Sequence, residues 1–183
     1  MKMKASTKDN LFIVLAIFMM GVLFYSSSQP YGKQSVTPLL DQILVNQPFK
    51  ELLSGVNFHY AGSEVSIAAQ GYSSFIEFFI RKGAHFGTYF LLGLFWFLGL
   101  KNKLSSSSLA ALIAWLLAAG YAAFDEFHQS FTADRTPLFQ DVILDSVGAL
   151  TGILVALLFI QLFTKKKRKK LNAKLSSFLS KYR

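Results

Sequence analysis

Three groups of polar and charged side chains stand beside long apolar stretches of this sequence. In the first group Glu77, Arg81, His85 and Tyr89 are spaced four residues apart, so a helix would present them along one face. The other two groups come later in the chain, and Lys82 adjoins the first. The second group comprises Asp125, Glu126, His128, Gln129, Asp134 and Arg135, and the third comprises Asp141 and Asp145.

These residue types are suited to binding an anion and to moving a proton. Arg81, Lys82 and Arg135 would hold a phosphate or a carboxylate, the arginines through bidentate hydrogen bonds. Histidine and carboxylate side chains exchange protons near neutral pH, so the catalytic candidates are Asp125, Glu126, His128 and His85. The predicted ligand-binding set is Arg81, Lys82, His85, Tyr89, Asp125, Glu126, His128, Gln129, Arg135, Asp141 and Asp145. The alternative is an ion-pair network that only locks helices together.

Other kinds of site fit the sequence less well. Asp125, His128 and His85 are possible metal ligands, but the neighbouring cations would repel a metal ion, so we expect neither a metal nor a cofactor. The sequence contains no HExxH, G-x-S-x-G or Walker motif. It also contains no cysteine, which excludes disulfides, thiolate catalysis and cysteine-bound zinc.

Composition points to a membrane protein. Of the 183 residues 52% are hydrophobic and only 16% are charged, whereas soluble domains average about 25% charged. The apolar residues form four stretches near the roughly 20 residues that a spanning helix needs, which predicts an all-α bundle of four transmembrane helices. The stretches are 11–25, 84–100, 109–124 and 142–163. The first is also consistent with a cleaved signal peptide, because Lys2, Lys4 and Lys8 precede it and the small residues Ser26-Ser27-Ser28 follow it, but the absence of a clear A-x-A site favours an uncleaved span.

The distribution of Lys and Arg predicts the orientation. Basic residues lie near the N-terminus, at Lys101 and Lys103, and after the last span, which places both termini in the cytoplasm. Arg81 and Lys82 are exceptions at the outer end of the second span. The net charge of +9 equals the nine Lys and Arg of 165–183, so we expect a lipid bilayer and no nucleic acid as partner. The predicted organisation is a cytoplasmic N-terminus at 1–10, a span at 11–25, an extracytoplasmic insert at 26–80, a core of three spans at 81–163 and a basic cytoplasmic tail at 164–183.

The insert and the tail have their own patterns. Apolar residues between 39 and 53 recur with a helical period, which predicts a helix there. The alternation of apolar and polar residues at 56–60, followed by Ala61-Gly62 and 65–67, predicts a short hairpin with a solvated His59. In the tail, Leu171, Leu175, Phe178 and Leu179 are spaced as one face of a helix on the inner leaflet.

Small residues predict that the polar groups converge. Gly148 and Gly152 form a small-xxx-small pair in the fourth span, and the second span contains the small residues Gly83, Gly87 and Gly93. These two helices can therefore approach closely. Asp145 lies one turn inside an apolar helix and needs a partner, which we expect to be Arg81 or Arg135.

Three motifs in this order resemble the VanZ-like family over about residues 15–160. The resemblance implies a multi-pass protein of the bacterial cytoplasmic membrane; some members accompany resistance to teicoplanin-type glycopeptides, and no reaction is firmly assigned. Many members have Asn where this chain has Asp145, so this chain departs from the family pattern in the charge at that position. The motifs are Arg81-Lys82-x-x-His85-Phe86-x-x-Tyr89, Asp125-Glu126-x-His128-Gln129-x-Phe131-x-x-x-Arg135 and Asp141-Val142-x-x-Asp145-x-x-Gly148-x-x-x-Gly152.

The resulting hypothesis is a protein of the bacterial cell envelope that binds or modifies an anionic amphiphile at the outer leaflet. The ligand would be an envelope lipid or the glycopeptide itself, and the outcome would be lower susceptibility to teicoplanin. The alternatives are a phosphoryl- or acyl-transfer enzyme acting on an envelope lipid and a non-catalytic scaffold that recruits wall enzymes through 26–80. Catalysis stays open between these alternatives, and the sequence predicts no particular oligomeric state.

Overall fold

Four long helices dominate the computed structural model, which describes the backbone of residues 7–181 and the side chains of residues 7–170 and 172. They are α1 (Thr7–Ser27), α6 (Tyr72–Leu100), α7 (Ser107–Gln129) and α8 (Phe139–Lys181). Each is long and apolar enough to cross a membrane. The predicted four-span, all-α architecture is confirmed.

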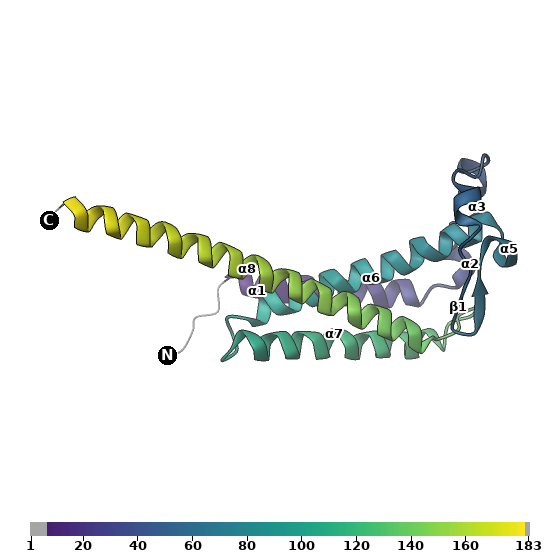
Figure 1. Ribbon diagram of the computed structural model, residues 1–183. Coiled ribbons are helices and arrows are strands. Elements are labelled where there is room, and N and C mark those ends of the chain that lie inside the picture. Colours follow the sequence, from purple (N-terminus) through teal and green to yellow (C-terminus); the bar gives the residue numbers. More distant parts are fainter. Residues whose placement is uncertain (1–6, 182–183) are drawn as a thin grey trace.

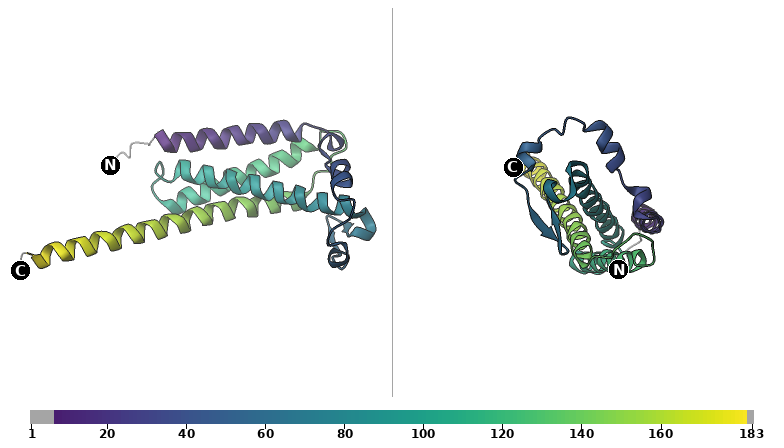
Figure 2. Two further views of the ribbon diagram at one scale, coloured as in Figure 1. Left: turned by 90° about the horizontal axis from the view of Figure 1, so that it is seen from above. Right: turned by 90° about the vertical axis from the view of Figure 1, so that its right-hand side faces the viewer.

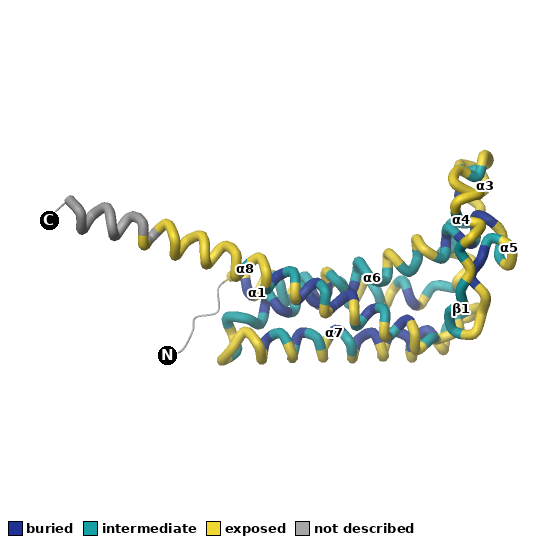
Figure 3. The backbone as a smooth tube through the Cα atoms, viewed as in Figure 1, coloured by how far each residue is buried: buried dark blue, intermediate teal, exposed yellow. Residues whose placement is uncertain are grey.

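The four helices run side by side, with the insert at one end (Figure 1). The first turn of α1, the α6–α7 loop and the long extension of α8 lie at the opposite end. Buried positions follow the inner faces of the bundle, whereas residues 161–170 of α8 are exposed (Figure 3). The insert and the α7–α8 loop therefore share one end of the molecule, where the polar groups of the sequence also lie.

Glycine controls how closely α6 and α8 approach each other. A Cβ atom at Gly148 would lie 2.6 Å from the carbonyl oxygen of Phe86, and Gly152 and Gly93 lie even closer to the opposite backbone. The prediction of close packing is confirmed for these three positions. Gly83 and Gly87 do not serve it, because a Cβ at either would meet no atom within 4 Å.

The helix α7 is attached to its neighbours by alanines and by two long hydrogen-bonding side chains. Ala114 and Ala118 are fully buried. The Trp115 indole donates to the Ser146 carbonyl of α8 at 3.1 Å, and the Tyr121 hydroxyl donates to the Met20 carbonyl of α1 at 2.5 Å. Backbone carbonyls of two different helices thus position α7.

The insert contains four short helices and a hairpin. They are α2 (Tyr31–Gln34), α3 (Thr37–Ile43), α4 (Lys50–Leu53), β1 (Phe58–Tyr60), β2 (Ser63–Val65) and α5 (Ile67–Gln70). The predicted hairpin is confirmed: Phe58 pairs with Val65 and Tyr60 with Ser63, Gly62 takes φ +84° in the turn, and His59 is exposed.

The single helix expected across 39–53 is wrong, because the chain breaks between α3 and α4. Pro48 has no N–H to donate and disfavours a helical conformation in the residue before it. On either side of Pro48, Gln47 and Phe49 take left-handed φ values of 44° and 61°, which also end a helix. The apolar spacing was helical, but proline chemistry overrides it.

Glu77 ties the insert to the bundle. Its carboxylate is 1% exposed and accepts hydrogen bonds from the Ser35 hydroxyl at 2.9 Å, from the Val36 N–H at 3.2 Å and from the Thr37 hydroxyl. A carboxylate at the start of α3 also compensates the positive end of that helix. Glu77 therefore positions the insert, although the sequence had placed it in one stripe with Arg81.

Two boundaries differ from the lengths of the apolar stretches. The helix α6 begins at Tyr72, twelve residues before the apolar stretch at 84–100, and α8 runs without interruption through the basic residues 165–170. The predicted apolar face of Leu171, Leu175, Phe178 and Leu179 lies outside the residues whose side chains are described.

Candidate functional site

Two cavities open at the insert end of the bundle. The larger, of about 610 Å³, is enclosed by the hairpin, the first half of α6 and the segment from Gln129 to Asp141. The smaller, of about 180 Å³, lies between the ends of α1 and α7 and the first half of α6. Both cavities are lined by Arg81, His85, Gln129 and Arg135. The predicted convergence of the polar groups therefore brings these residues around a common space.

The Lys82 ammonium is neutralised at the edge of the larger cavity. It lies 2.6 and 2.7 Å from the two carboxylate oxygens of Asp141 and 4.6 Å from the ring centre of Tyr60. The Tyr60 hydroxyl donates to the same carboxylate at 2.5 Å, so the hairpin, α6 and α8 meet at Asp141. Burial and the bonded Asp141 carboxylate raise the pKa of Tyr60, which keeps its hydroxyl protonated as a donor.

Asp145 pairs with a histidine, and the arginine partner predicted from the sequence is wrong. His85 Nδ1 lies 3.3 Å from Asp145 Oδ2, and the Asp145 residue is 1% exposed. The reason is the register of α6 on α8: Phe86 packs against Gly148, which brings the neighbouring His85 to the level of Asp145. Among the described residues, Asp145 Oδ1 and the buried Tyr89 hydroxyl have no hydrogen-bond partner.

The two arginines form no ion pair with any residue that the structure describes. The Arg81 guanidinium lies 4.3 Å from the ring centre of Tyr31. Arg135 donates to the Gln29 carbonyl at 3.2 Å and to the amide oxygens of Gln34 and Gln129 at 2.5 and 3.4 Å. Neutral groups thus hold both guanidinium groups in place while their charges stay uncompensated by a bonded carboxylate.

Burial and the positive charge of Arg81 lower the pKa of Arg135. The charges of Asp125 and Glu126 act in the opposite direction without bonding it. A guanidinium stays protonated at any physiological pH, so the two arginines face the cavities as a pair of like charges.

Asp125 and Glu126 hold three segments of the chain together. Asp125 accepts from the Ser27 hydroxyl at 2.6 Å and from the Gln129 amide at 3.0 Å. Glu126 accepts from the Leu138 N–H at 2.7 Å, which attaches the α7–α8 loop to α7. The carboxylate oxygens of both residues accept hydrogen bonds from protein donors, so these contacts directly support a role in positioning the end of α1 and the α7–α8 loop on α7.

A family model described as VanZ/LLP1 matches residues 12–160. The chain belongs to the VanZ/LLP1 family. The match includes most of each of the four candidate spans, the insert and the lining of both cavities, and it confirms the resemblance drawn from the three motifs. No curated protein and no solved structure matches the chain.

His128 of this VanZ/LLP1 chain lies apart from the two cavities. Its ring stacks on Phe24 with centroids 4.2 Å apart, and Nε2 lies 3.0 Å from the Ser28 hydroxyl of the segment after α1. Successive helical residues are rotated by about 100°, so the side chains of His128 and Gln129 point in clearly different directions around α7. Of these two, Gln129 alone lines the cavities. Within the described part of the VanZ/LLP1 chain, no three His, Asp or Glu side chains are arranged to hold a metal ion.

Sequence reasoning missed the contributions of the insert to this site. Tyr60, Tyr31, Gln29 and Gln34 contact the charged groups, yet no periodicity or motif distinguishes the last three from other polar residues of the insert. Tyr60 alone carried a signal, since it ends the alternating strand before the Ala61-Gly62 turn.

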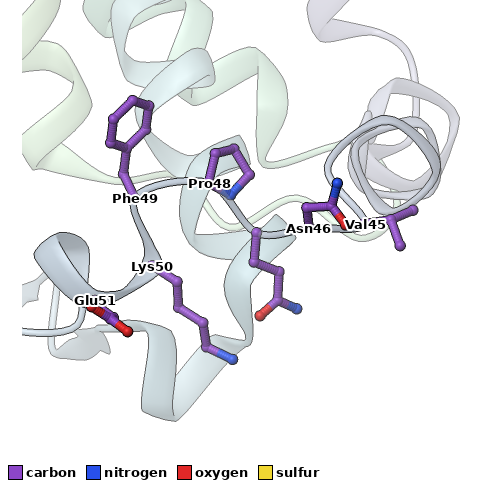
Figure 4. Close-up of a pocket in the computed structure, with 7 residues that line it drawn as sticks. Val45, Asn46, Pro48, Phe49, Lys50 and Glu51 are labelled. Atoms are coloured by element: carbon purple, nitrogen blue, oxygen red, sulfur yellow. The ribbon is translucent and has the colours of Figure 1, made fainter.

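A third hollow, of about 440 Å³, belongs to the insert alone. Only the contiguous residues 45–51 line it, and their side chains point in different directions (Figure 4). It receives no side chain from the bundle and lacks the convergent charges of the two cavities, so we do not include it in the candidate site.

Proposed function

We propose that this VanZ/LLP1-family membrane protein binds the phosphate or carboxylate of an anionic envelope amphiphile in the larger cavity. The observation that carries the proposal is the contrast between the cations around that cavity. Lys82 and His85 are matched with Asp141 and Asp145, whereas Arg81 and Arg135 have no carboxylate partner among the described residues. An anion would supply the missing partner, and arginine binds both groups in bidentate fashion.

The size and position of the cavity support the same ligand class. Its volume of about 610 Å³ lies within the range of roughly 300–1,000 Å³ typical of small-molecule sites. Under the orientation predicted from Lys and Arg, this end of the bundle faces away from the cytoplasm. A lipid phosphate or the carboxylate of a lipoglycopeptide is then the accessible anion. Holding such a molecule would lower the access of a teicoplanin-type drug to its target.

Charge removal at the two arginines tests the proposal. Purified wild type, Arg81→Gln, Arg135→Gln and the double variant are reconstituted in phosphatidylcholine vesicles that contain a small fraction of fluorescent phosphatidylglycerol. We expect each single variant to weaken binding about tenfold, because one charge-assisted hydrogen bond contributes about 1.5 kcal/mol or more. Lys101→Gln removes a positive charge at the opposite end of the bundle and serves as the matched control.

The same variants, expressed at equal membrane levels, are compared for teicoplanin susceptibility. The double variant should be as susceptible as cells lacking the protein, and Lys101→Gln should match the wild type. Binding that is identical in the double variant and the wild type would refute the proposal.

A second candidate function is acid–base catalysis on the bound amphiphile. The observation that favours it is His85, which lines both cavities while Asp145 holds its Nδ1 side. A carboxylate that orients one ring nitrogen leaves the other to exchange a proton. His85→Gln keeps a donor for Asp145 but removes the base. Turnover of labelled envelope lipid by the wild type and none by His85→Gln, with binding retained, would establish catalysis.

A further inference from the structure

The smaller cavity separates α1 from the first half of α6. Leu23 and Ser26 line it on the α1 side, and Ala84 and Thr88 line it on the α6 side. At its inner end it shares Arg81, His85, Gln129 and Arg135 with the larger cavity. The two cavities therefore meet at the uncompensated arginines.

The separation arises because α1 changes its neighbour along its length. Toward its start α1 packs on α6, where a Cβ at Gly99 would lie 2.6 Å from Ile13 and where Phe12 stacks on Phe95. Toward its end α1 is bonded to α7 instead, through Tyr121 and through Ser27. The two views of the bundle show α6 diverging from α1 toward the insert (Figures 1 and 2).

Beyond Arg81 and His85, the α6 wall of this gap consists of Ala84 and Thr88, which carry no charge. Ala84 is exposed. The Thr88 hydroxyl bonds to the carbonyls of its own helix, both at 2.9 Å, so it presents no free donor to the gap. Both walls belong to helices that can span the membrane. The gap would therefore open toward the hydrocarbon of the bilayer, with Gln34 as its one lining residue from the insert, whereas several insert residues line the larger cavity.

We infer that the smaller cavity is a lateral entrance for a membrane lipid with an anionic phosphate head group. The head group lies between Arg81 and Arg135, and the first part of an acyl chain leaves through the gap between α1 and α6. At about 180 Å³ the cavity is below the size that holds a whole drug-sized ligand, so the rest of the chain remains in the bilayer. This inference rests on the proposed function and narrows its ligand from any anionic amphiphile to a lipid that enters from the membrane.

A photoreactive lipid and a soluble head group distinguish the two levels of the proposal. The full chain is reconstituted in phosphatidylcholine vesicles with phosphatidylglycerol that carries a diazirine on its acyl chain, and labelled peptides are mapped after illumination. Binding of glycerol phosphate, which has the phosphate but no acyl chain, is measured in parallel. Ala84→Trp blocks the gap, and Ala123→Trp places the same bulk on an exposed position of α7.

We expect the label to concentrate on 23–27 and 81–88 and to be competed by unlabelled phosphatidylglycerol. For Ala84→Trp, the labelling is divided by the glycerol phosphate binding of the same variant. This ratio should fall at least about fivefold below that of the wild type, which corresponds to a loss of about 1 kcal/mol in lipid binding. Ala123→Trp should label as the wild type does. Even labelling of all lipid-facing helices, or full labelling of Ala84→Trp, would overturn the lateral entrance while glycerol phosphate binding left the proposed function standing. If neither probe binds, the proposed function fails, and the inference fails with it.

Discussion

The two halves of α6 are built for different purposes. Toward Leu100, Gly93 and Gly99 press directly on α8 and α1, so the helix has neighbours on several sides. Toward Tyr72, a Cβ atom at Gly83 or Gly87 would meet no atom within 4 Å, and two cavities are lined by this half of the helix. The same residue type thus has opposite consequences along one helix. The packed half stabilises the bundle, and the open half leaves room for a ligand.

Charge follows the same division within the open half. Lys82 and His85 turn toward α8 and are bonded to Asp141 and Asp145. Arg81 turns toward the insert and lies on Tyr31, without a carboxylate among the described residues. Within this half, the basic side chains bonded to α8 are matched with carboxylates, whereas the one that lies on the insert is not.

Substitution in the packed contact should have the largest effect. Gly152→Leu would drive a side chain into the Phe90 backbone, which cannot move aside as a flexible side chain can. We expect a loss of about 3 kcal/mol or more, with little folded protein in the membrane. Gly87→Leu, on the open half of α6, should retain wild-type levels. Levels in isolated membranes and thermal unfolding in detergent measure both, and equal losses would contradict the division of α6.

Removal of a basic side chain that is bonded to a carboxylate should cost less than that steric clash but more than removal of one that is not. His85→Ala leaves the Asp145 carboxylate buried without its partner, which costs about 3 kcal/mol. Adding Asp145→Asn to His85→Ala removes the stranded charge and should restore part of the loss. Arg81→Ala breaks no ion pair and should cost about 1 kcal/mol or less. Thermal unfolding of the four proteins checks this order. A larger loss for Arg81→Ala than for His85→Ala would mean that Arg81, and not His85, makes the stabilising contact.

The sequence alone predicted the general architecture because its signals are local. Apolar length predicts each span, Gly148 and Gly152 predict a close helix contact, and the alternation before Gly62 predicts the hairpin. Partners across the fold were harder to predict. Asp145 bonds to His85 because of the helix register set by Phe86 and Gly148, and no spacing within either helix encodes that register. Apart from Tyr60, the insert residues that reach the site have no local signal, since their role arises only when Glu77 ties the insert to α6.

The smallest expected effect concerns the hairpin and depends on pH. The Tyr60 hydroxyl donates to Asp141, and burial with that carboxylate raises the pKa of Tyr60 above its ordinary value, which is about 10. A raised folded-state pKa means that this contribution is complete below about pH 10 and is lost as the pH rises further, because the unfolded chain then ionises first. Tyr60→Phe should cost about 1 kcal/mol at neutral pH, the usual value of one hydrogen bond. The gap between wild type and Tyr60→Phe in thermal unfolding should therefore shrink above pH 10, whereas Tyr25→Phe, at an exposed position of α1, should show no such convergence. A stability difference that stays constant from pH 7 to 11 would mean that the Tyr60 hydroxyl does not hold the hairpin to Asp141. The hairpin would then lack this attachment to the bundle beside the first half of α6.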